Sequence, residues 1–367
     1  MDTMTRQRFS DATPERIEFG DHDMRRGFVR PDSVLRRLEA AKCGFGLRRL
    51  DLQVTMLLER QYPPEIGSLL LARVTQLGEQ DRIELVDGRL ARLYVDDEIL
   101  VSCGHLDIPG GNGVRVPERM QRCALATAAG LAGEMETVNG RPTLLQPIGM
   151  LGDISGAPLN LSRFALPAVD RFAASVPVFA ILATDMHSGA STTSADVIRS
   201  LTRSGLRVAA AKITGPGGGV DYWQMLDAGA VAARDFGDCG LPSTFRIPID
   251  ALRRMFHSLL SDLERSSPDA IVIELSIGTC RREAEAMLVA PWFAQNVDRM
   301  LIDASDGVSL HRCIGAAREL GLRIAAVAGS IVDGPSAAHK TIGNPGVRAL
   351  SQRELQDPSV LTPLFFS

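Results

Sequence analysis

Short apolar runs alternate with helix-like stretches over the second half of this 367-residue chain, and this alternation constrains the fold more than any other feature. The runs are VPVFAILA, LRVAAAKITG, DAIVIEL, DRMLIDAS and LRIAAVAGS, separated by stretches such as IDALRRMFHSLLSDLERS and VSLHRCIGAARELG. Strands that are apolar on both faces and alternate with helices are typical of a parallel sheet covered on both sides. The sequence therefore predicts a parallel-sheet α/β domain over residues 176–367.

The first half of the chain has a different pattern. Residues 1–62 are polar and Arg-rich, with an expected helix over 31–41 and an expected strand over 50–58. Residues 63–118 contain short β-type runs, with Asp87-Gly88 as a two-residue hairpin signal, and predict a small β-barrel-like domain. Residues 119–175 predict a helical linker or strap, because a helical segment over 118–133 precedes a stretch interrupted by Pro and Gly.

Composition excludes several classes of protein. With 40 Lys and Arg against 44 Asp and Glu and no basic block, the chain lacks the basic face of a nucleic-acid or anionic-membrane binder. Its apolar runs fall short of the roughly 18–20 residues of a membrane helix, and its polar start has no signal-peptide core. Six scattered cysteines without a C-x-x-C pair argue against a zinc site or a redox dithiol. We expect a cytoplasmic protein.

The stretch ATDMHSGASTT, residues 183–193, connects the first apolar run to a predicted helix, which is the position of a P-loop. A P-loop holds a phosphate chain with backbone N–H groups and a helix amino terminus, a lysine reaches the β and γ oxygens, and the next Ser or Thr binds Mg²⁺. Here Gly189 keeps the glycine before the lysine, while Ala190 replaces the lysine, and Ala183 or Thr184 replaces the first glycine. The residues expected to line a nucleotide are Thr184, Met186, His187, Ser188, Gly189, Ala190, Ser191 and Thr192.

The loop resembles the G-T-D-x-x-x-G-K-[ST]-T loop of dethiobiotin-synthetase-type P-loop proteins. Over residues 63–330 the chain is similar to an uncharacterised bacterial P-loop family that includes the D-glutamate N-acetyltransferases. The resemblance rests on LARVTQLGEQDRIELVDGRLARLYVDDEI, the loop, GLRVAAAKITGPGGGVDYWQMLDAGA and DAIVIELSIG, in that order. It implies a P-loop NTPase fold in the C-terminal half and assembly as a homo-oligomer. Relatives of this kind have a loop close to S-G-K-T-T-T, so Ala190 is a departure from the family pattern.

The missing lysine has three explanations: an exchange made by design, a natural sequence that recruits another cation, or a site that serves another ligand such as coenzyme A. A charge-assisted contact is worth about 1.5–3 kcal/mol, so its loss weakens nucleotide binding by roughly 10- to 150-fold. The same residues also fit a plain strand-to-helix turn, because Ser and Thr at a helix start are common N-caps.

The side chains of four residues, one in the loop and three beyond it, are candidates for catalysis. Lys212 is one of three lysines against 37 arginines and ends the second apolar run, where open α/β sheets bind ligands. Glu274 ends AIVIE in the position of a Walker-B-type carboxylate. We expect Lys212 to hold phosphates and Ser191 and Glu274 to hold Mg²⁺. Asp185 in the loop and Asp221 after the glycine run 215–219 are expected to face the substrate.

The remaining sequence features give weaker indications of a functional site. The glycine run is not a dinucleotide fingerprint, because Val220 stands where G-x-G-x-x-G needs glycine, and no G-x-S-x-G turn supports a serine hydrolase. Tyr222 and Trp223 are expected to pack in the interior. The remaining acids near the strand ends are expected to be exposed loop residues: Asp235, Asp238, Asp303 and Asp306.

Three functions follow from these residues. The first is an enzyme that binds ATP and Mg²⁺ and activates a small carboxylate or amine, as a ligase or kinase does. The second, from the resemblance, is an N-acyltransferase that holds the pyrophosphate of acetyl-CoA in the loop and acts on an amino acid. The third is a non-catalytic nucleotide-binding protein. The expected partner is a small molecule, with no nucleic acid and no membrane.

Overall fold

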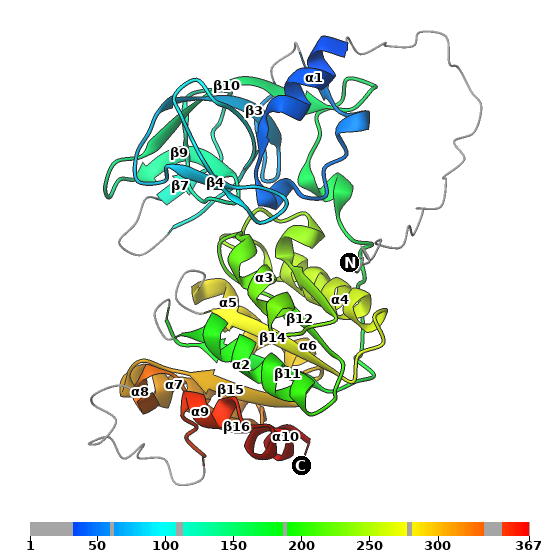
Figure 1. Ribbon diagram of the computed structural model, residues 1–367, viewed down its shortest axis with the longest axis vertical. Coiled ribbons are helices and arrows are strands. Elements are labelled where there is room, and N and C mark those ends of the chain that lie inside the picture. The colour runs from blue at the N-terminus through cyan, green and yellow to red at the C-terminus, as the bar shows by residue number, and fades with distance from the viewer. Residues whose placement is uncertain are drawn as a thin grey trace, which may run out of the picture.

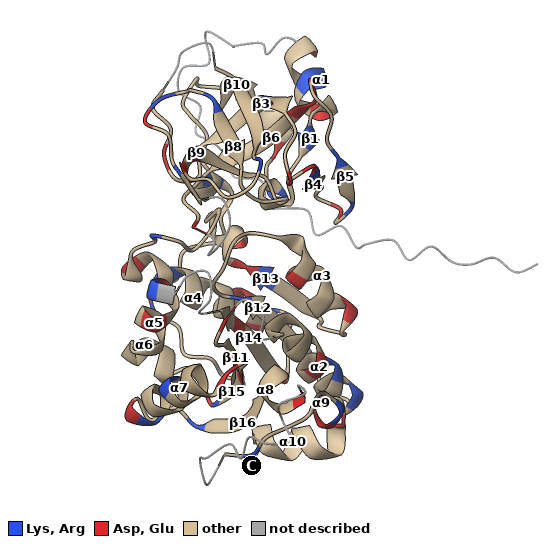
Figure 2. Cartoon of the chain, turned by 90° about the vertical axis from the view of Figure 1, so that its left-hand side faces the viewer, with Lys and Arg blue, Asp and Glu red and all other residues tan. Residues whose placement is uncertain are grey.

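A computed structural model describes residues 32–58, 62–107, 113–185, 189–276, 281–333 and 347–366. Figure 1 shows two parts, one built mainly from strands and one from a sheet layered between helices. In the view of Figure 2, residues of both charges are spread over both parts. Among the described helices, none combines the length and apolarity that a membrane span needs.

The C-terminal part contains a sheet in which every pairing is parallel, as the sequence predicts. Its strand order is β13-β12-β14-β11-β15-β16. The short strand β13 was not predicted, because Arg and Asp interrupt its four residues. The strands are β11 (Val178–Ala183), β12 (Val208–Lys212), β13 (Ala232–Asp235), β14 (Ala270–Ser276), β15 (Arg299–Asp303) and β16 (Ile324–Ala328).

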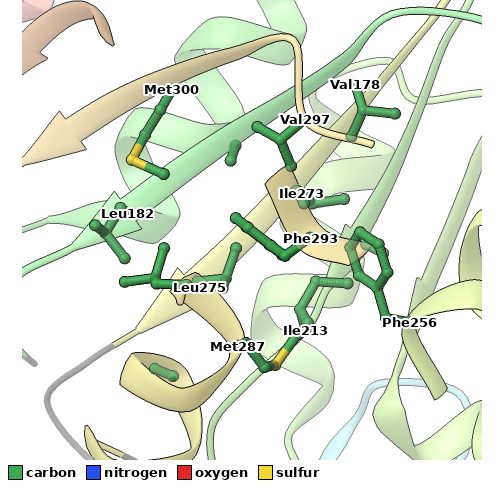
Figure 3. Close-up of a cluster of buried hydrophobic side chains, with 14 of the residues drawn as sticks. Val178, Leu182, Ile213, Phe256, Ile273, Leu275, Met287, Phe293, Val297 and Met300 are labelled. Atoms are coloured by element: carbon green, nitrogen blue, oxygen red, sulfur yellow. The ribbon is translucent and has the colours of Figure 1, made fainter. Parts of the chain in front are cut away.

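Helices bury both faces of this sheet, because alternate strand residues point to opposite sides. Phe179 and Ile181 of β11 belong to one apolar cluster, while Val178 and Leu182 belong to the other (Figure 3). The first cluster is completed by α2 (Ala190–Arg203), α3 (Gly219–Asp227), α9 (Gln352–Leu355) and α10 (Pro358–Phe366). The second is completed by α4 (Ile249–Glu264), α5 (Arg281–Leu288), α6 (Pro291–Ala294), α7 (Gly307–Glu319) and α8 (Ser330–Asp333).

The strand order sets where this sheet can bind a ligand. Adjacent strands β11 and β14 send the chain in opposite directions, since β11 leads through α2 to β12 and β14 leads through α5 and α6 to β15. Ligands of open α/β sheets bind outside the carboxyl ends of the strands at such a switch point. The loops after β11, β12 and β14 are therefore the place to search for a site.

The N-terminal part begins with α1 (Asp32–Ala40), which confirms the expected helix, and contains a largely antiparallel sheet. Its pairings run from β6 through β3, β10, β8 and β9 back to β6, but only two residue pairs join β9 to β6. So short a pairing does not establish a closed barrel, and the small β-barrel-like domain therefore stays a prediction. The strands are β1 (Lys42–Cys43), β2 (Met56–Leu57), β3 (Leu69–Gln76), β4 (Arg82–Glu84), β5 (Leu90–Arg92), β6 (Glu98–Cys103), β7 (Gly113–Arg115), β8 (Cys123–Leu125), β9 (Leu131–Thr137) and β10 (Thr143–Gly152).

Two local predictions in this part are wrong over all or most of their length. The helix expected over 118–133 and the helical linker expected from 119 are replaced by β8, β9 and β10, which pair with β3 and with one another. The alanines of this stretch favour a helix, but Gly130 at φ +94° makes a turn, and sheet pairing overrides the local preference. The strand expected over 50–58 is confirmed only at Met56–Leu57, which form β2, while Leu52–Val54 form a 3₁₀ helix. The Asp87-Gly88 hairpin between β4 and β5 is confirmed.

Glu98 makes the N-terminal sheet sensitive to acid. Arg37 contacts its two carboxylate oxygens at 2.7 Å each and Arg73 adds a contact at 3.0 Å, which together lower the pKa of Glu98 to about 2. A lowered carboxyl pKa stabilises the fold above the unfolded value near 4.5, and this contribution is lost as the pH falls toward 2. The side chains of Arg37 and Arg73 are 40% and 47% exposed, so solvent screens the contacts and we expect them to add about 1 kcal/mol to the free energy of unfolding. Urea unfolding measures the free energy of unfolding at pH 7 and at pH 3. The drop between these two pH values should be smaller in Glu98→Gln than in the unchanged chain, and an equal drop would contradict this prediction.

Candidate active site

The loop after β11 ends at the amino terminus of α2. Gly189 has φ +106°, a conformation that favours glycine, and no side chain caps the helix that it starts. The backbone N–H groups of the first turn and the helix dipole therefore face the loop, as an anion site requires. Met186, His187 and Ser188, expected to line a nucleotide, lie outside the described residues.

Four residues that the sequence singled out come together beside this helix end. The ammonium of Lys212 donates a hydrogen bond to Asp221 Oδ2 and lies 3.9 Å from Glu274 Oε1. Ser191 Oγ is 2.6 Å from Asp221 Oδ1 and 3.3 Å from Glu274 Oε1. The cation, the two carboxylates and the hydroxyl thus form one cluster, which we call the Lys212 cluster.

Neighbouring elements position the Lys212 cluster. Lys212 and Glu274 are register partners at the carboxyl ends of β12 and β14. Ser191 comes from the first turn of α2, and Asp221 from the first turn of α3. Because parallel strands end at the same edge of a sheet, residues far apart in sequence meet at the switch point.

Burial and charge oppose each other in the Lys212 cluster. Burial alone would lower the pKa of Lys212, but the charges of Glu274 and Asp221 outweigh it and the pKa is raised. Burial raises the pKa of Glu274, against the ammonium of Lys212, which lowers it. The Glu274 side chain is only 2% exposed, and its Oε2 has no hydrogen-bond partner among the described residues. A buried carboxylate oxygen without a partner calls for an explanation, and a bound ion or water would supply one.

A pocket of about 200 Å³ opens beside the Lys212 cluster. A larger pocket of about 460 Å³ lies between α5 and α7. Of the loop residues that the structure describes, only Thr184 lines it, so the Lys212 cluster belongs to the smaller pocket. The smaller pocket is lined by Asp185, Gly189, Ala190, Ser191, Thr192, Lys212, Gly215, Pro216, Glu274 and Ser276.

Asp185 lies in the same pocket but outside the Lys212 cluster. Its carboxylate accepts a hydrogen bond from Ser305, and Thr184 Oγ1 lies 3.4 Å away. Asp303, expected to be an exposed loop acid, is instead fully buried and accepts a hydrogen bond from Thr193 in the first turn of α2. Its backbone oxygen also accepts from Thr184 N at 2.9 Å. Asp303 therefore fixes both ends of the loop, a role that strand-end position alone does not reveal.

The N-terminal part holds α3 in place. Glu84 of β4, only 3% exposed, accepts a hydrogen bond of 2.7 Å from Gly219 N at the start of α3. Tyr222 and Trp223 pack against Phe45, with ring centroids 5.5 and 6.0 Å apart, which confirms that they pack, and both are half-buried. A Cβ at Gly219 would lie 2.2 Å from Glu84 Oε1, so at this position the glycine run serves contact with the N-terminal part.

Arg48 joins the two parts through buried charges. One of its nitrogens is 2.7 Å from both Asp235 Oδ1 and Asp238 Oδ2, and the guanidinium stacks 4.4 Å from the centroid of Phe45. Asp235 and Asp238 were expected to be exposed loop acids, but each is under 5% exposed. Their side chains also close a capping box at the 3₁₀ helix Phe236–Cys239. Asp306, the remaining such acid, is partly exposed and caps α7.

The Lys212 cluster suits a hard cation that keeps other ligands. Among the described residues, no three His, Cys, Asp or Glu side chains form a group that could hold a metal by themselves. Mg²⁺ is commonly bound by one or two carboxylates together with substrate phosphates and water, all through oxygen. Glu274, Asp221 and Ser191 offer such oxygens, and Glu274 Oε2 lacks a partner.

Comparisons with known proteins show remote likenesses only. No family model and no curated protein matches the chain. The kinase domain of the Escherichia coli tyrosine kinase Etk aligns at 11% identity and a TM-score of 0.29, over 41% of this chain and 66% of that domain. The signal recognition particle receptor FtsY from Elizabethkingia anophelis aligns at 14% and 0.35, over 56% and 70%. A GTPase from Pyrococcus abyssi aligns at 9% and 0.32, over 52% and 96%.

This chain thus spans just under two thirds of the kinase domain. At TM-scores of 0.29 to 0.35 these likenesses carry no argument about function.

Proposed function

We propose that this protein has a P-loop NTPase fold in its C-terminal half, binds ATP with Mg²⁺ at residues 183–193, and activates a small carboxylate or amine by ligation or phosphoryl transfer. One observation carries the proposal. Within the described part of the chain, the amino end of α2 has no side-chain cap and opens into a pocket together with a lysine, a hydroxyl and a buried carboxylate oxygen that lacks a partner. Phosphoryl transfer depends mainly on positioning and charge neutralisation, and these groups supply both.

Each residue of the site then has a task. The first N–H groups of α2 bind phosphate oxygens, and Lys212 contributes the cation that Ala190 cannot. Ser191 and Glu274 would hold Mg²⁺, while Asp185 and Asp221 face the second substrate. Bound ATP and Mg²⁺ would supply the phosphoryl group and most of the charge neutralisation. Asp303 keeps the loop in register through Thr193 and Thr184.

Ala190 gives specific support to a second candidate, an acetyl-CoA-dependent N-acyltransferase acting on an amino acid. A loop without its lysine can still bind a pyrophosphate through backbone N–H groups and the helix dipole. Acyl transfer needs no contact with a γ-phosphate, so the alanine costs this reaction little.

Calorimetric titration with ATP–Mg²⁺ and, separately, with acetyl-CoA distinguishes the candidates. Binding of ATP that requires Mg²⁺ supports the ligase or kinase. Binding of acetyl-CoA that is indifferent to Mg²⁺ supports the acyltransferase. If neither ligand binds, both enzymatic proposals are wrong, and ATP binding without turnover over a panel of carboxylates and amines would indicate the non-catalytic alternative.

Glu274→Gln should weaken ATP–Mg²⁺ binding by about tenfold or more, because a contact to a charged group contributes about 1.5–3 kcal/mol. The change preserves the shape of the side chain and removes its charge. Glu283→Gln is the matched control, since Glu283 is also buried but accepts from Arg246 N outside the Lys212 cluster. Titration calorimetry of both variants tests the assignment, and equal affinities would remove Glu274 from the site.

A further inference from the structure

We propose that Lys212 occupies the cation position of the site in the ligand-free chain, so that a divalent metal ion and the Lys212 ammonium exclude each other there. The metal position itself rests on the proposed function. The exclusion goes beyond it, because it assigns Lys212 two alternating partners: the carboxylates of the Lys212 cluster, and the phosphates of a bound nucleotide.

The geometry around the ammonium is that of a cation site. Asp221 Oδ2 accepts its hydrogen bond, Glu274 Oε1 is 3.9 Å away, and Ser191 Oγ bridges the two carboxylates at 2.6 and 3.3 Å. These groups come from three different elements and converge on one position. Glu274 Oε2 is buried and has no hydrogen-bond partner among the residues that the structure describes, so the carboxylate still has an oxygen to offer.

Electrostatic repulsion prevents the metal ion and the Lys212 ammonium from occupying the site together. One ammonium balances only half of the charge of the two carboxylates, whereas a divalent ion would balance it fully. If both cations stayed within about 4 Å of each other in a site of low dielectric constant, their repulsion would be severe. Entry of the metal ion therefore requires the ammonium to leave.

The pocket offers the Lys212 ammonium a second position, beside the phosphates of a bound nucleotide. Lys212 and the first turn of α2 line the same space of about 200 Å³, where a phosphate chain would lie. Gly215, at φ +136°, packs close to the lysine stem, and a Cβ there would be 3.1 Å from Lys212 Cε. Without a nucleotide the departing ammonium gains no phosphate in exchange for the two carboxylates that it leaves, so the metal ion binds poorly alone. Nucleotide and metal ion should therefore strengthen each other's binding by the same factor.

Manganese titration without nucleotide tests the exclusion directly. We expect Lys212→Met to bind Mn²⁺ at least tenfold more tightly than the unchanged chain, and Lys212→Met combined with Glu274→Gln to lose that gain. Lys42→Met is the matched control, because Lys42 pairs with Asp97 in the N-terminal part and its loss should leave Mn²⁺ affinity unchanged. A folded Lys212→Met chain with no gain in Mn²⁺ affinity would overturn the proposal.

A second measurement follows Lys212 by NMR in the unchanged chain and uses a variant only to assign the signal. The chain has three lysines, so ¹³C labelling at lysine Cε gives three signals, and Lys212→Arg identifies one of them. We expect Mg²⁺ with a non-hydrolysable ATP analogue to shift the Lys212 signal, and millimolar Mg²⁺ alone to leave it unchanged. Tight binding of Mg²⁺ alone without a shift would show that both cations fit together, and the exclusion would be wrong.

The outcomes separate the two proposals. If Lys212→Met gains Mn²⁺ affinity while ATP binds neither chain, the exclusion holds and the proposed function is wrong. If ATP–Mg²⁺ binds but the variant gains no Mn²⁺ affinity, the proposed function stands and the exclusion is wrong.

Discussion

Replacing Ala190 by lysine should raise the affinity for ATP–Mg²⁺ by roughly 10- to 150-fold, the equivalent of about 1.5–3 kcal/mol for one charge-assisted contact. Ala190 is the first residue of α2 and lines the pocket beside Lys212. A lysine at this position lies where a P-loop places its phosphate-binding cation. Asp185 and Glu274 line this pocket with Lys212, and Asp221 pairs with the lysine, so carboxylates outnumber cations there and a lysine at position 190 is electrostatically tolerated.

Titration calorimetry of Ala190→Lys against the unchanged chain measures this gain. Ala157→Lys is the matched control, because it makes the same exchange at an exposed position of the N-terminal part. A gain confined to Ala190→Lys would show that the loop binds phosphate and lacks only its cation. If ATP bound neither chain while acetyl-CoA bound the unchanged one, the ligase or kinase proposal would be wrong.

Arg48→Met should lower the free energy of unfolding by about 3–5 kcal/mol, the loss seen when one partner of a buried ion pair is removed. The arginine is 12% exposed, and the Asp235 and Asp238 side chains are each 5% exposed. Methionine keeps much of the volume but leaves two buried carboxylates close together without a cation. The packing of the guanidinium on Phe45 and Tyr222 is also lost.

Urea unfolding at several pH values checks this prediction. Burial raises the pKa of Asp235, and removing Arg48 should raise it further, so the folded variant takes up a proton more readily than the unfolded chain. A raised carboxyl pKa costs stability above the unfolded value and costs nothing below it. The difference in free energy of unfolding between Arg48→Met and the unchanged chain should therefore become smaller as the pH falls from 7 toward 4. Arg73→Met, at an exposed arginine, should cost under about 1 kcal/mol, and an equal cost at both positions would contradict the argument.

The sequence predicts the C-terminal sheet well because its strands are buried on both faces, and such runs have few other interpretations. It fails over residues 118–133, where the alanines of β8 and the turn before β9 resemble a helix and only pairing with distant strands decides. The same limit hides β13, whose four residues include Arg234 and Asp235. Local patterns carry no information on partners that lie far along the chain.

For the candidate site, the sequence identified the residues but not all of their contacts. Lys212, Asp221, Glu274 and Ser191 were each found from position at a strand or helix end, and the fold brings them together. Glu84 was missed, because nothing in a short β-hairpin indicates that its carboxylate reaches α3. Asp303 was expected to be exposed, because a strand-end acid looks the same in sequence whether it meets solvent or a threonine hydroxyl.

The contact between Glu84 and the start of α3 bears on how such a protein can evolve. The helix that carries Asp221 receives its terminal acceptor from a strand more than 130 positions earlier in the chain. Recombination that joined the parallel sheet to an unrelated N-terminal part would leave that helix end and the two aspartates around Arg48 without partners. We therefore expect the two parts to be inherited as one unit, with correlated substitutions at Glu84 and Gly219 among descendants of this chain.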